Sequence, residues 1–416
     1  MNRFHENLSV FNFSPYRYLF FARLITILGN SIAPIALAFA VLDIGGSVSE
    51  LGFIVASRSI FNVIFLLIGG VLADRYSRNQ LLVSSSVIAA VSQAIIAWSV
   101  LGGSATVLNL ALLGTLNGAA AGIALPASSS MIPQTVPVQN LRAANALIQL
   151  GISGGMIIGT SLGGLLISSV GPGWGLAIDA IGFAVSAPLY FLIRTASIQV
   201  TPPADNFLKC LKEGWEEFTS KAWVWAIVIQ FTIINAAFGG IMMVLGPVIA
   251  DSSFGRASWG IMIAAQSVGL MTGSYFALRW RPRHDLFISV ILIAFCSLPI
   301  FMLSLSASST WLIIAFFIAG ITFGRFEVSW AHSLQTHISQ AKLARIYAYD
   351  AIGSFVAIPF GELVAGPLAI HYGSSNVLLF SSIVVVLATL GASFVPEIRK
   401  LEDPSQFKSQ KTTKSQ

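Results

Sequence analysis

Residues 69–82 read GGVLADRYSRNQLL, and the apolar stretch FNVIFLLI occupies positions 61–68 directly before them. Asp74, Arg75 and Arg78 bring three charges together in a chain of which only 10% is charged. Such a change from apolar to charged residues marks the place where a membrane-spanning helix reaches water. The fold therefore depends on how many similar apolar segments the chain contains.

The composition of the 416-residue chain is that of a membrane protein, since 55% of its residues are hydrophobic. A helix needs roughly 20 apolar residues to cross a hydrocarbon core of about 30 Å. The sequence predicts an all-α, polytopic membrane protein with twelve transmembrane helices. Their predicted ranges are 17–42, 49–74, 81–101, 106–128, 144–169, 174–194, 222–248, 257–279, 285–305, 310–335, 347–371 and 375–395.

Lysine and arginine predict the orientation. All but three of the 23 lie at the N-terminus, on the tail or on alternate connections, which places both termini in the cytoplasm. The exceptions are Arg58, Arg256 and Arg325. Because topology accounts for the basic residues, we expect no nucleic-acid partner. The two cysteines, Cys210 and Cys296, fall on a loop and in a helix, so neither a disulfide nor a metal site is expected.

The longest polar connection divides the predicted helices into two sets of six. The predicted parts are an N-terminal bundle over 1–194, a cytoplasmic linker over 195–221, a C-terminal bundle over 222–395 and a disordered cytoplasmic tail over 396–416. An amphipathic helix at the membrane surface or a solvated helix fits the linker. Shifting the chain by 202 residues superposes several glycines, among them Gly159 on Gly361. A duplicated six-helix unit explains this and is typical of secondary transporters.

Residues 70–78, GVLADRYSR, resemble the G-x-L-A-D-R-x-G-R signature of the major facilitator superfamily, with Ser77 in place of a glycine. The resemblance implies the major facilitator fold and a cytoplasmic latch in which these charges contact helix 11 in one transport state. A simple topological anchor is the alternative. The latch residues are Gly70, Asp74, Arg75 and Arg78.

The fifth predicted helix carries a glycine pattern that resembles the antiporter signature G-x-x-x-G-P-x-x-G-G, with Thr160 in place of the proline. These glycines are also expected to bring helices into close contact. They are Gly155, Gly159, Gly163 and Gly164. Further stretches, such as EGWEEF at 213–218, resemble the twelve-span bacterial drug-efflux branch, which includes macrolide- and siderophore-type exporters.

Ionisable residues within predicted spans are candidates for proton coupling or gating, because burying a charge in the bilayer costs a few kcal/mol. Arg58 and Glu362 are predicted at similar depth, on helices 2 and 11, which pack together in the fold that the resemblance implies. We expect them to form an ion pair, either coupled to protons or permanently structural. For Asp179 we favour a structural role.

Arg325 and Glu327 stand two residues apart on the tenth predicted helix and so point about 200° apart. We expect Glu327 to face the substrate cavity as a proton-coupling residue and Arg325 to turn toward a neighbouring helix, with the reverse assignment left open. Neutral polar residues are expected either to contact substrate or to hydrogen-bond between helices. They are Asn30, Asn117, Gln230 and Asn235.

The sequence lacks phosphate-binding loops, nucleophile elbows and Cys/His clusters, so we expect no cofactor, no metal and no enzyme activity. The resemblance implies proton-coupled efflux of amphipathic drug-like compounds by alternating access. We expect a monomer in the inner membrane of a bacterium, with small molecules, protons and the lipid bilayer as partners. The alternatives are a dedicated exporter of one metabolite or siderophore, an importer, or a receptor or scaffold that does not transport.

Overall fold

A computed structural model describes residues 9–137, 140–194, 215–216, 218–280, 282–338 and 340–402. The described residues form helices and connections, with no strand among them. Contacts group the chain into two units. Unit 1 comprises Met1–Pro203 and Gly246–Ala264, and unit 2 comprises Ala204–Leu245 and Ala265–Gln416.

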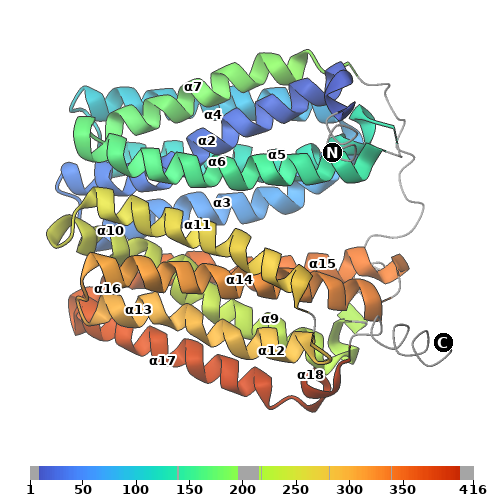
Figure 1. Ribbon diagram of the computed structural model, residues 1–416. Coiled ribbons are helices and arrows are strands. Elements are labelled where there is room, and N and C mark those ends of the chain that lie inside the picture. Colours follow the sequence, from blue (N-terminus) through green and yellow to red (C-terminus); the bar gives the residue numbers. More distant parts are fainter. Residues whose placement is uncertain are drawn as a thin grey trace. The chain divides into compact units, whose positions relative to one another are not determined.

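Unit 1 contains the first six long helices together with a short stretch from the second half of the chain. Within it, α3 packs along α5, while α7 packs against both α2 and α4 (Figure 1). Its elements are η1 (Ser9–Asn12), α2 (Ser14–Asp43), α3 (Val48–Arg75), α4 (Arg78–Leu101), α5 (Val107–Thr135), α6 (Leu141–Val170), α7 (Pro172–Phe191), most of α10 (Met243–Ser252) and the start of α11 (Arg256–Arg279).

Local sequence signals set the starts of these helices. Ser47 accepts a hydrogen bond from the backbone N–H of Glu50, and the Glu50 carboxylate accepts one from the backbone of Ser47. Thr106 and Asn109 form the same reciprocal pair at the start of α5. The predicted spans in this half therefore begin within a few residues of the observed helices.

Unit 2 contains the remaining helices, several of which are interrupted. A π-helical stretch, η3, lies between α9 and α10, a 3-10 turn, η4, lies between α12 and α13, and α15 ends next to α16. The elements are α9 (Ala222–Ile234), η3 (Asn235–Met242), α12 (Asp285–Leu292), η4 (Ile293–Cys296), α13 (Ser297–Ser304), α14 (Ser309–His337), α15 (Gln340–Phe355), α16 (Ala357–Tyr372), α17 (Ser374–Ser393) and α18 (Pro396–Lys400).

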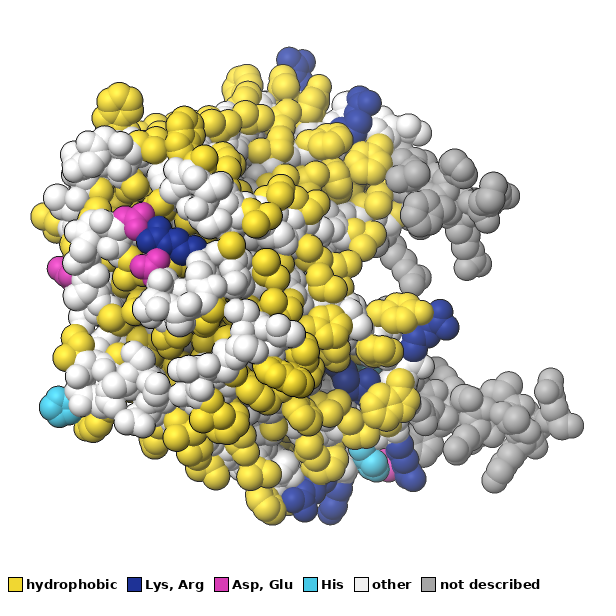
Figure 2. All heavy atoms as spheres, turned by 60° about the vertical axis from the view of Figure 1, so that its left-hand side comes forward, with side chains coloured by type: hydrophobic (Ala, Val, Ile, Leu, Met, Phe, Trp, Pro, Cys, Tyr) yellow, Lys and Arg dark blue, Asp and Glu magenta, His cyan; other side chains and the backbone are white. Residues whose placement is uncertain are grey.

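Eleven helical segments among the described residues are long and apolar enough to cross a membrane. Helix α11 occupies the twelfth predicted span, 257–279, and falls outside that set because polar residues and glycines such as Gln266 and Gly269 dilute its apolar character. Large apolar side chains also lie on the surface, including Trp98 at 80% exposed. Figure 2 shows hydrophobic side chains over much of one face, with few charged ones. Such a surface suits lipid.

The start of the tail corrects one prediction. Residues from 396 were expected to be disordered, yet Pro396–Lys400 form α18. Ile398 is fully buried, and the Glu397 carboxylate accepts a hydrogen bond of 3.1 Å from the backbone N–H of Trp223 at the start of α9. Residues 403–416 lie outside the described residues, as do 195–214 and 217 of the predicted linker.

Candidate functional site

The opening motif spans the end of α3 and the start of α4. The α3 backbone continues to Arg75, and the Ser77 hydroxyl accepts a hydrogen bond from the backbone N–H of Gln80, which caps α4. Serine at the usual glycine position therefore has a local role as an N-cap. The side chains of Gly70, Asp74 and Arg75 lie outside the described residues, so the latch stays a prediction.

Arg58 lies at the contact between α3 and α5, where its Nε donates a hydrogen bond of 3.1 Å to Oδ1 of Asn117. A Cβ at Gly118 would collide with the Arg58 carbonyl oxygen, so glycine is what lets the two backbones meet here. Asn117 is 2% exposed. It binds a neighbouring helix, which was one of the two roles expected for it.

Asp179, on α7, is the most buried acid among the described side chains of unit 1. Its side chain is fully buried against Gly29 of α2, and neither carboxylate oxygen accepts a hydrogen bond of standard geometry from a described residue, although the Gln93 side chain lies close enough to act on it. Arg58 acts on it electrostatically. A buried, unbonded carboxylate is costly when it is charged, so Asp179 joins the candidates for proton uptake, although sequence reasoning favoured a structural role.

Glu362 is 3% exposed on α16. Its neighbour Gly361 lies against Gly240 of η3, where an added Cβ on Gly240 would come within 2.6 Å of the Gly361 Cα. This close approach holds the Glu362 segment against the π-helical stretch. The expected Arg58–Glu362 ion pair would join the two units and stays a prediction.

Arg325 and Glu327 have opposite environments on α14. Arg325 is 3% exposed and donates a hydrogen bond of 2.6 Å to Oδ1 of Asp285, at the start of α12. Its guanidinium also lies over the Trp280 ring at 4.4 Å. Glu327 is exposed. Arg325 thus turns toward a neighbouring helix rather than into open space, while a role for Glu327 in the substrate cavity stays a prediction.

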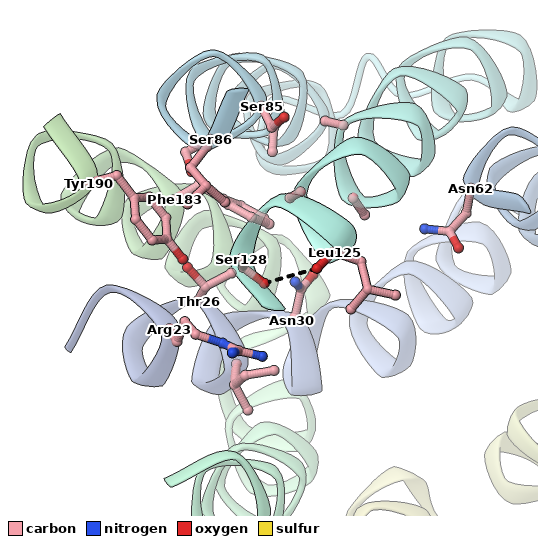
Figure 3. A pocket seen from close by; sticks show the side chains of 16 residues that line it. Arg23, Thr26, Asn30, Asn62, Ser85, Ser86, Leu125, Ser128, Phe183 and Tyr190 are labelled. Atoms are coloured by element: carbon pink, nitrogen blue, oxygen red, sulfur yellow. Dashed lines mark hydrogen bonds between the residues drawn. The ribbon is translucent and has the colours of Figure 1, made fainter. Parts of the chain in front are cut away.

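The other predicted polar residues divide between helix contacts and a pocket. Gln230 is 1% exposed and donates to the Thr389 hydroxyl at 3.1 Å, and Asn235 donates to the Ser354 carbonyl at 2.9 Å. Both therefore connect helices within unit 2. Asn30 instead lines a pocket of about 220 Å³ inside unit 1 (Figure 3).

The glycine pattern of α6 lies against two other helices of unit 1. Added Cβ atoms at Gly155, Gly159 and Gly163 would meet Ile27, Leu28 and Ile32 of α2, at 3.0, 2.6 and 3.0 Å. A Cβ at Gly164 would lie 2.7 Å from the Gly260 Cα of α11. The pattern therefore allows close helix packing at each of its four positions.

Two charged groups were not identified as site residues from the sequence. Arg256 hydrogen-bonds Asp43 through both terminal nitrogens and Asp251 through Nε at 2.6 Å. Arg256 is one of the three basic residues that do not follow the predicted distribution of lysine and arginine. These two acids pair with its charge. Arg23 of α2 lines the pocket in Figure 3 and was missed because it was counted with the cytoplasmic N-terminus. Arg23 could have been identified as a candidate from its position inside the predicted span 17–42.

Comparison with known proteins covers nearly the whole chain. The family model described as Major Facilitator Superfamily matches residues 19–362. The multidrug efflux pump Tap of Mycobacterium tuberculosis is 23% identical over 409 residues, covering 94% of this chain and 96% of Tap. The enterobactin exporter EntS of Escherichia coli is 25% identical over 398 residues, with 92% and 93% covered.

Among solved structures, the nucleoside transporter NupG superposes with a TM-score of 0.73 at 14% sequence identity. The match covers 93% of this chain and 99% of that one. At this identity the likeness concerns the fold alone. It agrees with the all-helical, membrane-spanning architecture predicted from the sequence.

Proposed function

The chain belongs to the major facilitator superfamily, and from that premise we propose that it exports amphipathic organic compounds in exchange for protons, by alternating access. The observation that carries the direction of transport is full-length similarity to two exporters, Tap and EntS. A shared domain alone would not extend over more than nine-tenths of both chains. The glycine pattern of α6, which resembles that of antiporters, supports the same direction.

Proton coupling requires a membrane acid that can bind and release a proton. Glu327 is exposed on α14, Glu362 is buried on α16, and Asp179 is buried on α7 without a hydrogen bond of standard geometry from a described residue. Charging the buried carboxylates of Glu362 and Asp179 costs several kcal/mol, whereas their protonated forms are tolerated. Movement of a cation such as Arg58 toward or away from Asp179 would change that balance.

The proposed setting is the cytoplasmic membrane of a bacterium, with both termini in the cytoplasm and the protein acting as a monomer. The latch of Asp74, Arg75 and Arg78 would then lie on the cytoplasmic side. Two alternatives differ in what they transport or whether they transport: a dedicated exporter accepts one compound, and a receptor or scaffold moves none. Similarity to EntS favours the dedicated exporter as the second candidate.

The test uses inside-out vesicles that contain the protein and are acidified by respiration, with a pH-sensitive dye reporting the interior. Cationic, zwitterionic and acidic amphipathic compounds are added one at a time. Release of protons on adding several unrelated compounds is the expected result. A response to one compound only would favour the dedicated exporter, and no response from correctly inserted protein would contradict proton-coupled export.

Matched variants identify the coupling acid. Glu327→Gln, Glu362→Gln and Asp179→Asn remove one carboxyl group each, and at least one should abolish compound-driven proton release while compound binding persists. Glu50→Gln is the control, because Glu50 is a capping residue and glutamine also serves in a capping box. Full activity in all three test variants would exclude these acids from coupling.

A further inference from the structure

The pocket inside unit 1 has a composition that the proposed function does not explain. It lies among α2, α4, α5 and α7, with a contribution from α3, and encloses about 220 Å³. Figure 3 shows Arg23, Thr26 and Asn30 from α2 on one side of the pocket, with Phe183 and Ser86 across from them. This pocket is internal to the first bundle of helices.

Among the described residues, Arg23 is the only cation that lines the pocket. It stands nine residues after the start of α2 at Ser14, or about 14 Å along the helix axis. No carboxylate in the described part of the chain pairs with it, and the titratable groups that act on it are the phenols of Tyr190 and Tyr16. The Tyr16 hydroxyl already donates a hydrogen bond to the Ala144 carbonyl, at 2.8 Å.

The buried acid of this unit does not serve as the partner of Arg23. Asp179 lies against Gly29, and Arg58 is the cation that acts on it. Along α7, Asp179 is eleven residues from Tyr190, or about 16 Å. Arg23 is therefore a membrane-embedded cation without a protein counter-ion among the described residues, an arrangement that favours binding an anion.

The other polar groups of the pocket add a second, independent observation. Ser85 of α4 is 2% exposed, and its hydroxyl has no hydrogen-bond partner within the described parts of the chain. The Asn30 Oδ1 atom is likewise buried and unbonded there. Ser85 can donate to a ligand oxygen, whereas Asn30 Oδ1 can accept from a ligand hydroxyl. Buried polar groups are normally satisfied, and a ligand bearing oxygens would satisfy both.

The other residues that line the pocket indicate the chemical character of the remainder of the ligand. Phe183, Leu82, Ile27 and several alanines give the pocket apolar walls. A guanidinium binds a planar carboxylate through two parallel hydrogen bonds. We propose that this pocket binds the carboxylate end of an aromatic organic acid, with Arg23 as the anion-binding residue and Ser85 as a hydroxyl donor. Calling that acid a transport substrate rests on the proposed function, but its binding does not.

The test measures binding to purified full-length protein in detergent micelles by titration calorimetry. The probes are benzoate, neutral benzamide and cationic benzylamine, which share a ring and differ in charge. Benzoate should bind at least about tenfold more tightly than benzamide or benzylamine, because only the anion makes a charge-assisted pair with Arg23. Equal binding of benzoate and benzamide, or no benzoate binding, would overturn the proposal.

Variants assign the site to Arg23. Arg23→Gln should weaken benzoate binding at least about tenfold and leave benzamide unaffected, whereas Arg23→Lys should retain part of the affinity. Arg17→Gln is the matched control, since Arg17 lies on the same helix but is exposed and outside the pocket. Unchanged benzoate affinity in Arg23→Gln would refute the assignment. If Arg23→Gln fails to fold, Ser85→Ala should still weaken benzoate binding, and a benzoate affinity equal to that of the unmodified protein would refute the site.

A phospholipid headgroup could supply the same negative charge. Short-chain phosphatidylglycerol is therefore added as a competitor, and it should displace benzoate less effectively than naphthoate does. Stronger displacement by the lipid would overturn the assignment to an organic acid. Binding is read without transport, so benzoate binding in a protein that moves no protons would contradict the proposed function and leave this site intact.

Discussion

Replacing Gly159 by alanine should destabilise unit 1, whereas the same change at Gly154 should not. Both glycines lie on α6, so the gain of about 0.8–1 kcal/mol in helix propensity applies to each variant and cancels between them. The Cβ at position 159 would stand 2.6 Å from the Leu28 carbonyl oxygen and 2.8 Å from the Ser31 Cβ. At position 154 it would meet nothing within 4 Å.

The expected magnitude follows from the crowding. Ordinary contact begins at 3.4 Å, so α6 and α2 must separate by several tenths of an ångström in Gly159→Ala. Overpacking of this kind costs about 1–3 kcal/mol. Gly159→Ala should therefore be less stable than Gly154→Ala by that amount, which corresponds to roughly 5- to 150-fold in the unfolding equilibrium.

Unfolding by SDS of the purified variants, followed by far-ultraviolet circular dichroism, measures this difference. Adding Ser31→Gly to Gly159→Ala removes one of the two close contacts and should restore part of the lost free energy. The Leu28 carbonyl belongs to the backbone, so recovery should stay incomplete. A Gly159→Ala variant as stable as Gly154→Ala would show that α6 and α2 do not approach this closely, and the packing argument would fail.

Three further predictions concern charged residues. Arg325→Gln should destabilise unit 2 by about 3–5 kcal/mol in SDS unfolding, because it removes the charged partner of the largely buried Asp285 and leaves that carboxylate with the Ser329 hydroxyl. In a cysteine-free background, a cysteine at position 327 should react with a water-soluble maleimide much faster than one at 325, since Glu327 is exposed and Arg325 is buried. Asp74→Asn should strongly reduce compound-driven proton release in vesicles if the latch operates.

Each of these has its own control. Asp285→Asn added to Arg325→Gln should recover part of the lost free energy, and a double variant as unstable as the sum of the singles would contradict the pairing. Equal labelling rates at 325 and 327 would contradict the opposite environments on α14. Wild-type proton release from inserted Asp74→Asn protein would reduce the motif to a topological anchor.

Most of the membrane-spanning segments could be predicted because lipid imposes a length on every apolar segment, although twelve were predicted and eleven described helices are long and apolar enough to cross a membrane. One interruption has a signal in the sequence: α15 ends at Phe355, four residues before Pro359, whose ring has no N–H to donate to the Phe355 carbonyl. The π-helical stretch η3 contains no proline and could not be predicted. There Gly240 approaches Gly361 of α16 closely, a contact that only the fold shows.

The charged residues show the same division. The spacing of Arg325 and Glu327 was enough to predict that they face different ways, since it follows from helix geometry alone. The partner of Arg325 could not be found in this way, because Asp285 lies at the edge of another span and only folding brings the two together. Arg23 was not identified from the sequence because the positive-inside rule counts basic residues near the ends of spans and takes no account of their depth along the helix.

The π-helical stretch Asn235–Met242 changes the angular phase of everything that follows it. In an α-helix each residue turns the chain by about 100°, and a π-type turn accommodates an additional residue. Positions after Met242 therefore lag by at least one residue's rotation behind an uninterrupted helix drawn from Ala222. A helical wheel drawn for 222–252 would therefore assign α10 an azimuth that is wrong by about 100°, roughly a quarter turn.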